Sequence, residues 1–214
     1  MSLKHYITLP GLLAALMLPG SAMATIIITT GVSNTGTNNV LFNIGGLAND
    51  ALTVQGVVNN AANTLVDFTS PQTLHGSGGQ ARVEGINSTT YDNFAVQIHS
   101  GESFTKLVWN LNTSSGSGTV IFTIDGVAYD GPDADTLPDA FTIGNGSNFF
   151  TIEASGGSAL GIVSYQTTGV TIQDTRQIRI GGVGTTGGGD VPEPATLFTA
   201  GLALCCFSLI RKCI

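Results

Sequence analysis

The sequence predicts an all-β domain, a two-sheet antiparallel β-sandwich of the jelly-roll type, with an N-terminal signal helix and a C-terminal transmembrane helix. Three observations favour this fold class. Short apolar segments recur along the central part of the chain, residues inside them alternate between apolar and polar, and Gly, Asn, Ser or Asp separate them. Period-two alternation is typical of strands with one buried face, and many short strands indicate a sandwich or barrel.

The alternation is clearest in residues 94–98 and 107–111, where every second residue faces the predicted core and the residues between them, such as Lys106, Val108 and Asn110, face solvent. Asp125 and Gly126 form a typical two-residue hairpin turn. The remaining predicted strands are Ile26–Thr30, Asn39–Ile44, Thr64–Phe68, Ala81–Ile86, Thr119–Ile124, Ala140–Ile143, Phe149–Ala154, Gly161–Gln166, Val170–Gln173 and Gln177–Ile180. The residues expected between the sheets include Phe94, Trp109, Phe122, Ile152 and Ile178.

The charge balance of the central part excludes one class of partner. Residues 25–190 hold four cations (Arg82, Lys106, Arg176 and Arg179) and thirteen acids, which gives a net charge of −9. Such a surface repels phosphate backbones, so we expect no nucleic-acid binding. It also repels an acidic polysaccharide unless a divalent cation bridges the two. All three cysteines lie after residue 204, so this part has no disulfide and no cysteine nucleophile.

The first 24 residues match a secretory signal peptide. Lys4 provides a positive start, an apolar stretch follows, and Ala22 and Ala24 form the small-residue cleavage site. Cleavage after Ala24 would leave a mature chain that begins at Thr25. We therefore expect residues 25–180 to form the β-sandwich domain outside the cytoplasm, followed by a glycine-rich linker over residues 181–190.

The last 24 residues, 191–214, combine a proline motif, an apolar helix and a basic end. Pro192, Glu193 and Pro194 precede a predicted transmembrane helix over residues 195–210, and Arg211 and Lys212 follow it. Sixteen helical residues span roughly 24 Å, slightly less than the bilayer core of about 30 Å. Flanking basic residues hold such an end at the cytoplasmic face.

This tail resembles the PEP-CTERM sorting signal of Gram-negative bacteria. The resemblance implies that an exosortase cuts near Pro192–Pro194 after transient anchoring in the inner membrane, and that the protein is released to the exterior or the cell surface. It also implies an association with exopolysaccharide or biofilm matrix. The resemblance covers the tail alone. The tail departs from the family pattern in its short basic cluster and in the final Cys213 and Ile214.

The central part offers no convincing catalytic set. His75 is expected in a loop and His99 on the outward face of a strand, and neither Ser77 nor Ser158 lies in a Gly-x-Ser-x-Gly elbow. The glutamates there are Glu84, Glu102 and Glu153; a glycosidase would need a shielded pair of carboxyl groups. Glu84 and Glu153 are predicted to point away from the core.

Two weaker binding hypotheses concern the segment after the predicted hairpin turn. Its five aspartates supply hard oxygen ligands that suit calcium, although a solvated acidic loop is the simpler interpretation. The predicted ligands are Asp125, Asp130, Asp133, Asp135 and Asp139. For a glycan, exposed aromatic platforms are expected at Tyr91, Tyr129 and Tyr165, with Tyr129 the first to mutate.

These observations favour a secreted, non-catalytic matrix or surface protein that is processed by an exosortase and associated with exopolysaccharide, without a cofactor other than the candidate calcium. Two alternatives stay open. One is a secreted glycan-active enzyme of the glycosidase kind, and the other is a surface protein that keeps its membrane anchor.

Overall fold

The computed structural model describes residues 25–61, 64–78, 81–131 and 137–184, and these form an all-β fold, as predicted. Every strand pair is antiparallel. In this part of the chain no helix is long and apolar enough to cross a membrane. The predicted signal helix and transmembrane helix lie outside the described residues. The strands are β1 (Thr25–Thr30), β2 (Thr37–Leu41), β3 (Ala51–Val58), β4 (Leu65–Ser77), β5 (Arg82–Gly85), β6 (Asn93–Ile98), β7 (Lys106–Thr113), β8 (Gly118–Ile124), β9 (Val127–Ala128), β10 (Ala140–Ile143), β11 (Gly146–Ser155), β12 (Ile162–Thr168) and β13 (Ile172–Gly181).

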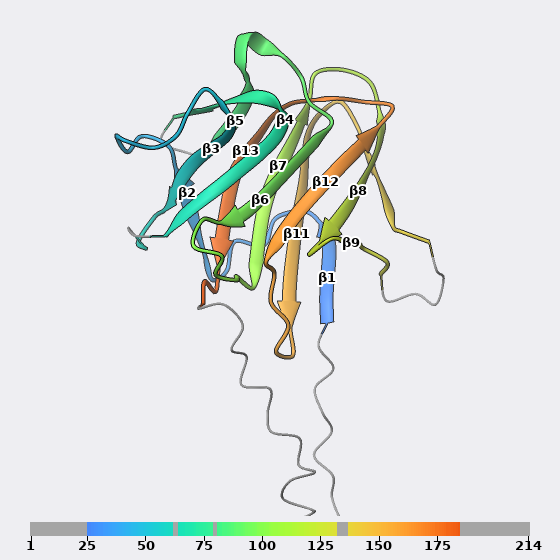
Figure 1. Ribbon diagram of the computed structural model, residues 1–214. Coiled ribbons are helices and arrows are strands. Elements are labelled where there is room, and N and C mark those ends of the chain that lie inside the picture. Colours follow the sequence, from blue (N-terminus) through green and yellow to red (C-terminus); the bar gives the residue numbers. More distant parts are fainter. Residues whose placement is uncertain (1–24, 62–63, 79–80, 132–136, 185–214) are drawn as a thin grey trace, which may run out of the picture.

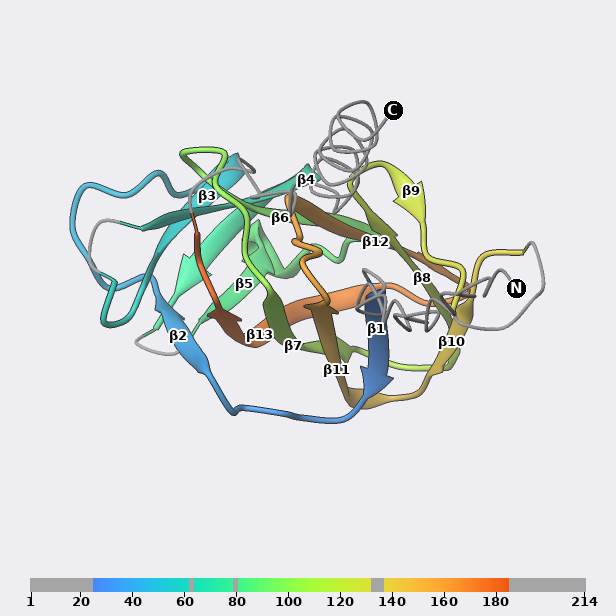
Figure 2. The same cartoon turned by 90° about the horizontal axis from the view of Figure 1, so that it is seen from below.

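The strands stack as two layers (Figure 1). One layer has the order β1-β11-β7-β13-β2, and the other has the order β3-β4-β6-β12-β8-β10 (Figure 2). The prediction of two separate sheets is wrong, because β2 pairs with β3 and β5 pairs with both β13 and β4. A single sheet therefore folds over on itself. Alternation in a sequence shows which side of a strand is buried, but it does not show whether hydrogen bonding continues around an edge.

Large aromatic side chains fill the space between the layers. The five residues predicted to lie there, Phe94, Trp109, Phe122, Ile152 and Ile178, are all fully buried. Contacts join the two layers directly: the ring centroids of Phe94 on β6 and Trp109 on β7 lie 6.2 Å apart, and those of Phe122 on β8 and Phe150 on β11 lie 4.9 Å apart. Such pairs contribute about 0.5–1.5 kcal/mol each beyond their buried area.

Several strand boundaries differ from the predictions. Strand β3 was not predicted; it contains Gly56, where an added Cβ would lie 2.5 Å from Cγ1 of Val40. Strand β4 extends past Pro71, which lies beside an irregularity in the pairing with β3, where proline is tolerated. The two strands predicted over residues 170–180 form one strand, β13, with register shifts against β7. Gly181, assigned to the linker, ends β13.

The connection between β1 and β2, residues 31–36, lies across the outside of the β1-β11-β7-β13-β2 layer (Figure 2). Gly31 N donates to the carbonyl of Phe149, and Ser33 N donates to Oγ1 of Thr151. Nζ of Lys106 donates to Oγ of Ser33 at 2.9 Å.

Residues 31–36 cover part of the outer face of β7. Lys106, Val108 and Asn110 were predicted to face solvent, yet all three are buried. The outer face of this layer is thus partly enclosed.

Candidate functional site

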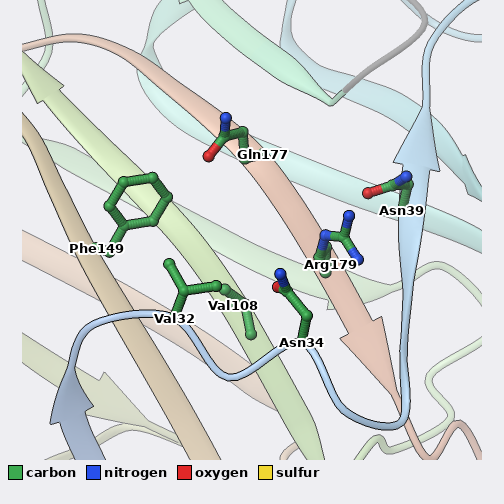
Figure 3. A pocket seen from close by; sticks show the side chains of 7 residues that line it. All are labelled: Val32, Asn34, Asn39, Val108, Phe149, Gln177 and Arg179. Carbon is green, nitrogen blue, oxygen red and sulfur yellow. The ribbon is translucent and has the colours of Figure 1, made fainter.

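A hollow with a volume of about 210 Å³ lies on this outer face, where residues 31–36 cross the layer. Its walls come from the crossing segment and from β2, β7, β11 and β13, and the side chains gather around a common space (Figure 3). The residues that line it are Val32, Asn34, Asn39, Val108, Phe149, Gln177 and Arg179. Segments far apart in the sequence therefore meet at this one place.

The irregularity in β13 sets the direction of the two polar side chains that this strand contributes. The register against β7 shifts between Arg176 and Arg179, and Gln177 has a φ of +54°. A non-glycine residue in the left-handed region carries strain, and such strain is concentrated at functional sites. Bulges likewise re-aim side chains next to such sites. The N–H of Gln177 donates to the carbonyl of Ala81 at 2.7 Å, which holds the bulge in place.

The polar side chains of the hollow have no internal partners. Among the described residues, the side-chain amides of Asn34, Asn39 and Gln177 make no hydrogen bond, and the Arg179 guanidinium makes neither a hydrogen bond nor an ion pair. Phe149 is half-buried beside them. Unused donors and acceptors around an aromatic ring are the groups that a protein needs to bind a polyhydroxylated ligand.

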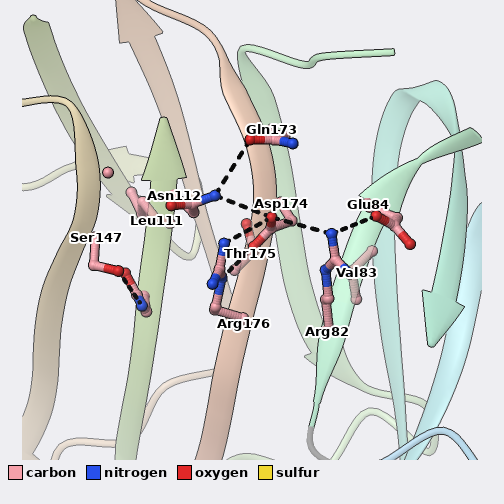
Figure 4. A network of polar contacts seen from close by, with 12 residues as sticks. Arg82, Val83, Glu84, Leu111, Asn112, Ser147, Gln173, Asp174, Thr175 and Arg176 are labelled. Carbon is pink, nitrogen blue, oxygen red and sulfur yellow. Dashed lines mark hydrogen bonds and ion pairs between the residues drawn. The ribbon is translucent and has the colours of Figure 1, made fainter. Parts of the chain in front are cut away.

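The neighbouring part of the same face is different, because most of its polar side chains are paired with one another (Figure 4). The carboxylate of Asp174, which is fully buried, accepts from Nε of Arg176 at 2.5 Å and from Nδ2 of Asn112 at 3.1 Å. Arg82 lies 3.5 Å from Asp174 and 2.7 Å from Glu84. Except for Nε of Arg82, which is buried without a hydrogen-bond partner among the described residues, these groups are paired internally, and the network links β5, β7 and β13.

Only part of the predicted calcium segment can be placed. Asp133 and Asp135 lie outside the described residues. Oδ1 of Asp125 accepts the N–H groups of Gly161 and Ile162 at 3.1 and 2.7 Å, and Oδ2 of Asp139 accepts the N–H of Gly131 at 3.1 Å.

Asp130 is exposed. No group of three or more His, Cys, Asp or Glu side chains in the described ranges is arranged to hold a metal ion. Calcium binding by the five aspartates stays a prediction.

The expectation of exposed tyrosine platforms is wrong. Tyr91, Tyr129 and Tyr165 are all buried, with exposed fractions of 2%, 8% and 1%. Tyr129 stacks on Phe141 with centroids 6.3 Å apart, and its hydroxyl accepts from the N–H of Ile28 at 3.3 Å. It reaches the surface only as part of the wall of a second, more open hollow. The tyrosines therefore belong to the packing of the core.

Two of these tyrosines share a buried hydroxyl cluster. The hydroxyl oxygens of Tyr91 and Tyr165 lie 3.0 and 2.9 Å from Oγ1 of Thr175, and that of Tyr91 lies 2.9 Å from the carbonyl oxygen of Val83. Burial raises the pKa of both phenols well above the usual value, because the charged form would lose its hydration. The nearby Asp174 adds to the rise in the pKa of Tyr91.

Both histidines and two of the three glutamates of this part of the chain form contacts with acidic or basic side chains at the surface. His99 is exposed, as predicted, but it lies in the turn after β6 rather than on a strand, 2.9 Å from Asp67. His75 is in β4 rather than in a loop and lies 2.6 Å from Asp50. Glu84 pairs with Arg82, and Glu153 pairs with Lys106 at 3.3 Å. Glu84 and Glu153 thus lie away from the core, as predicted.

Sequence reasoning did not identify the hollow. One pattern in the sequence could have pointed to it. Arg179 lies between Ile178 and Ile180, which face the core, so its side chain is expected to face outward, and residues 25–190 contain four cations in all. The convergence of Asn34, Asn39 and Gln177 had no signal, because it depends on the path of the crossing segment. The predicted sorting residues Pro192, Glu193, Pro194, Arg211 and Lys212, and the cleavage residues Ala22 and Ala24, lie outside the described residues.

Comparison with known proteins identifies no family. No protein-family model matches the chain, and no curated protein matches it. Among solved structures, the chain is similar to CBM29_1, a family 29 carbohydrate binding module from Piromyces equi. The two are 16% identical, the match covers 73% of this chain and 89% of that chain, and the TM-score is 0.21. A TM-score this low supports no inference about fold or function.

Proposed function

We propose that this protein is a secreted, non-catalytic matrix or surface protein that binds exopolysaccharide through the hollow of the outer face. The observation that carries the proposal is the set of unpaired polar side chains, Asn34, Asn39, Gln177 and Arg179, gathered beside the half-buried Phe149 ring. Hydroxyl-rich sugars need preformed donors and acceptors, because each group left unpaired on binding costs affinity.

The chemistry of the lining supports binding rather than turnover. Glycoside hydrolysis uses two carboxyl groups on either side of the scissile bond. The residues that line the hollow include no aspartate and no glutamate. The nearest acidic group along β13, Asp174, is already engaged by two arginines.

Binding is tested with the full-length protein in a polyoxyethylene detergent, which carries no sugar headgroup. Affinity electrophoresis through gels that contain the host's own polysaccharide measures retention. Asn34→Ala removes one lining amide and should weaken binding about two- to tenfold, the range expected for one hydrogen bond. Phe149→Ala should weaken it further, because it removes the aromatic surface of the hollow.

Asn145→Ala is the matched control, because Asn145 is an exposed amide outside the lining. It should bind as the native protein does. Absence of retention of the native protein, or equal losses in Asn34→Ala and Asn145→Ala, would refute binding at this hollow.

The export part of the proposal is supported by the sequence of the two ends. The signal-peptide pattern before residue 25 and the PEP-CTERM-like tail predict an exported protein that an exosortase trims. Intact-mass measurement of the protein recovered from the host's surface and medium tests this. A mass that lacks the residues after about position 192 supports processing, and a mass that retains them supports the permanently anchored alternative.

A further inference from the structure

From the pairing of the cations we infer that the hollow takes a sugar that carries a carboxylate, a uronate residue, with Arg179 as the group that binds it. This inference rests on the proposed function and specifies its ligand. Of the four cations in the described part of the chain, three are neutralised locally: Arg82 by Glu84 and Asp174, Lys106 by Glu153, and Arg176 by Asp174. Arg179 alone has no carboxylate partner there.

The surroundings of Arg179 favour an anion. Its backbone pairs with Asn39 on β2 and with Val108 on β7, and neither neighbour carries charge. The rest of the lining is amide, aliphatic and aromatic. A half-buried guanidinium among uncharged groups attracts a carboxylate more strongly than one in open water does, and its planar fork fits both oxygens of a carboxylate.

The overall negative charge does not prevent such binding. Residues 25–190 carry a net charge of −9, which repels a polyanion at long range. At physiological salt, however, exposed charges more than about 8 Å apart are largely screened. A carboxylate that contacts Arg179 is closer than that, and no acidic side chain lines the hollow. An acidic glycan can therefore be held without the bridging divalent cation that the charge balance alone requires.

The side-chain amides of the hollow provide the second group of contacts with a uronate. A uronate presents hydroxyl groups around the ring as well as the carboxylate, and Asn34, Asn39 and Gln177 can hydrogen-bond them while Arg179 holds the charge (Figure 3). Removing the charge of Arg179 should consequently weaken the binding of a uronate. Much of the binding of the corresponding uncharged sugar should remain, because the amides still bind its hydroxyl groups.

The test uses matched probes: oligosaccharides of galacturonate and of glucuronate, and their methyl esters, which keep the backbone and lose the charge. Binding to the full-length protein in polyoxyethylene detergent is measured by calorimetry, with calcium and with EDTA. The native protein should bind an acid form about tenfold more tightly than its ester, because a hydrogen bond to a charged group contributes more than a neutral one. The preference should weaken with added salt and persist in EDTA.

The variants separate the parts of the inference. Arg179→Gln should lose the preference for the carboxylate, so that each oligouronate and its methyl ester bind this variant within about twofold of each other. Arg179→Lys should retain part of the preference, because it keeps the charge and loses the fork. Asn145→Ala should change neither.

Different outcomes overturn different claims. Equal affinity of native protein for acids and esters, or a preference that Arg179→Gln retains, overturns the role of Arg179 and leaves polysaccharide binding standing. If EDTA abolishes the preference for the uronate, a bridging calcium ion binds the carboxylate, and the role of Arg179 is likewise overturned. Failure to bind these probes and the host's polysaccharide overturns the proposed function together with this inference.

Discussion

Replacing Tyr165 by phenylalanine should destabilise the protein at neutral pH and make it more stable than the native protein above about pH 11. The phenol of Tyr165 is buried, its pKa is raised by burial and by the neighbouring Tyr91, and its hydroxyl lies 2.9 Å from Oγ1 of Thr175. At neutral pH the substitution removes this hydrogen bond, at a cost of about 1 kcal/mol.

The reversal follows from proton linkage. In the unfolded chain Tyr165 ionises with a pKa of about 10, and in the folded protein it stays protonated to a higher pH. The unfolded state therefore gains stability as the pH rises above 10. Its advantage from this one residue rises by about 1.4 kcal/mol for each pH unit above 10 over which the folded protein keeps the phenol protonated. A phenylalanine side chain cannot ionise, so the variant avoids that loss and the two stability curves cross near pH 11.

The assay is urea denaturation between pH 8 and pH 12, followed by the fluorescence of Trp109. Trp109 is the single tryptophan, it is fully buried, and its ring centroid lies 5.2 Å from that of Tyr165. Thr113→Val is the control, because it removes a buried hydroxyl whose 2.7 Å hydrogen bond to the carbonyl of Gly144 is similar but does not titrate.

The control curve should run parallel to the native curve, displaced by about 1 kcal/mol. Parallel curves for Tyr165→Phe and the native protein up to pH 12 would refute the assignment of a raised pKa to Tyr165.

Two further predictions concern stability. Asp174→Ala should lower the free energy of unfolding by about 2 kcal/mol, because Arg176 and Asn112 lose a buried acceptor, whereas Arg82 keeps Glu84 and both arginine side chains are more than a third exposed; a loss below about 0.5 kcal/mol in urea denaturation would show that Arg176 and Asn112 find other partners. Gly118→Ala should cost about 2 kcal/mol, because its Cβ would lie 2.3 Å from the Thr168 carbonyl oxygen. Gly144→Ala, whose Cβ meets nothing within 4 Å, should stay within about 0.5 kcal/mol, and equal melting temperatures for both glycine variants would contradict the packing argument.

The sequence predicted the fold class because alternation directly reports burial. Phe94 and Trp109 lie in clear period-two segments, and both are in the core. Tyr165 lies in the same kind of pattern, because Val163 and Thr167, two positions before and after it, are also buried. It was nevertheless expected to be exposed, because its hydroxyl group is polar. What the pattern could not show is that Thr175, ten residues away, would pair with its hydroxyl.

The site was harder to predict because non-local geometry creates it. The hollow depends on residues 31–36 lying over β7 and β11, and on one positive φ at Gln177 that shifts the register of β13. Neither feature leaves a local composition signal. Strand β3 was missed for a related reason: Gly56 interrupts its apolar pattern to allow close approach to Val40, a contact that the sequence does not encode locally.

The position of β13 dictates when the domain can fold. This final strand lies inside its layer, between β7 and β2, and β1 pairs with β11 over a long stretch of sequence, as in Thr25 with Ser155, which are 130 positions apart. The strand that joins β7 to β2 is therefore missing until residue 181 has been synthesised. Such long-range pairings fold slowly, on the millisecond-to-second scale. A chain that cannot close early stays unfolded until its last strand is made, a property that the export proposed above would require.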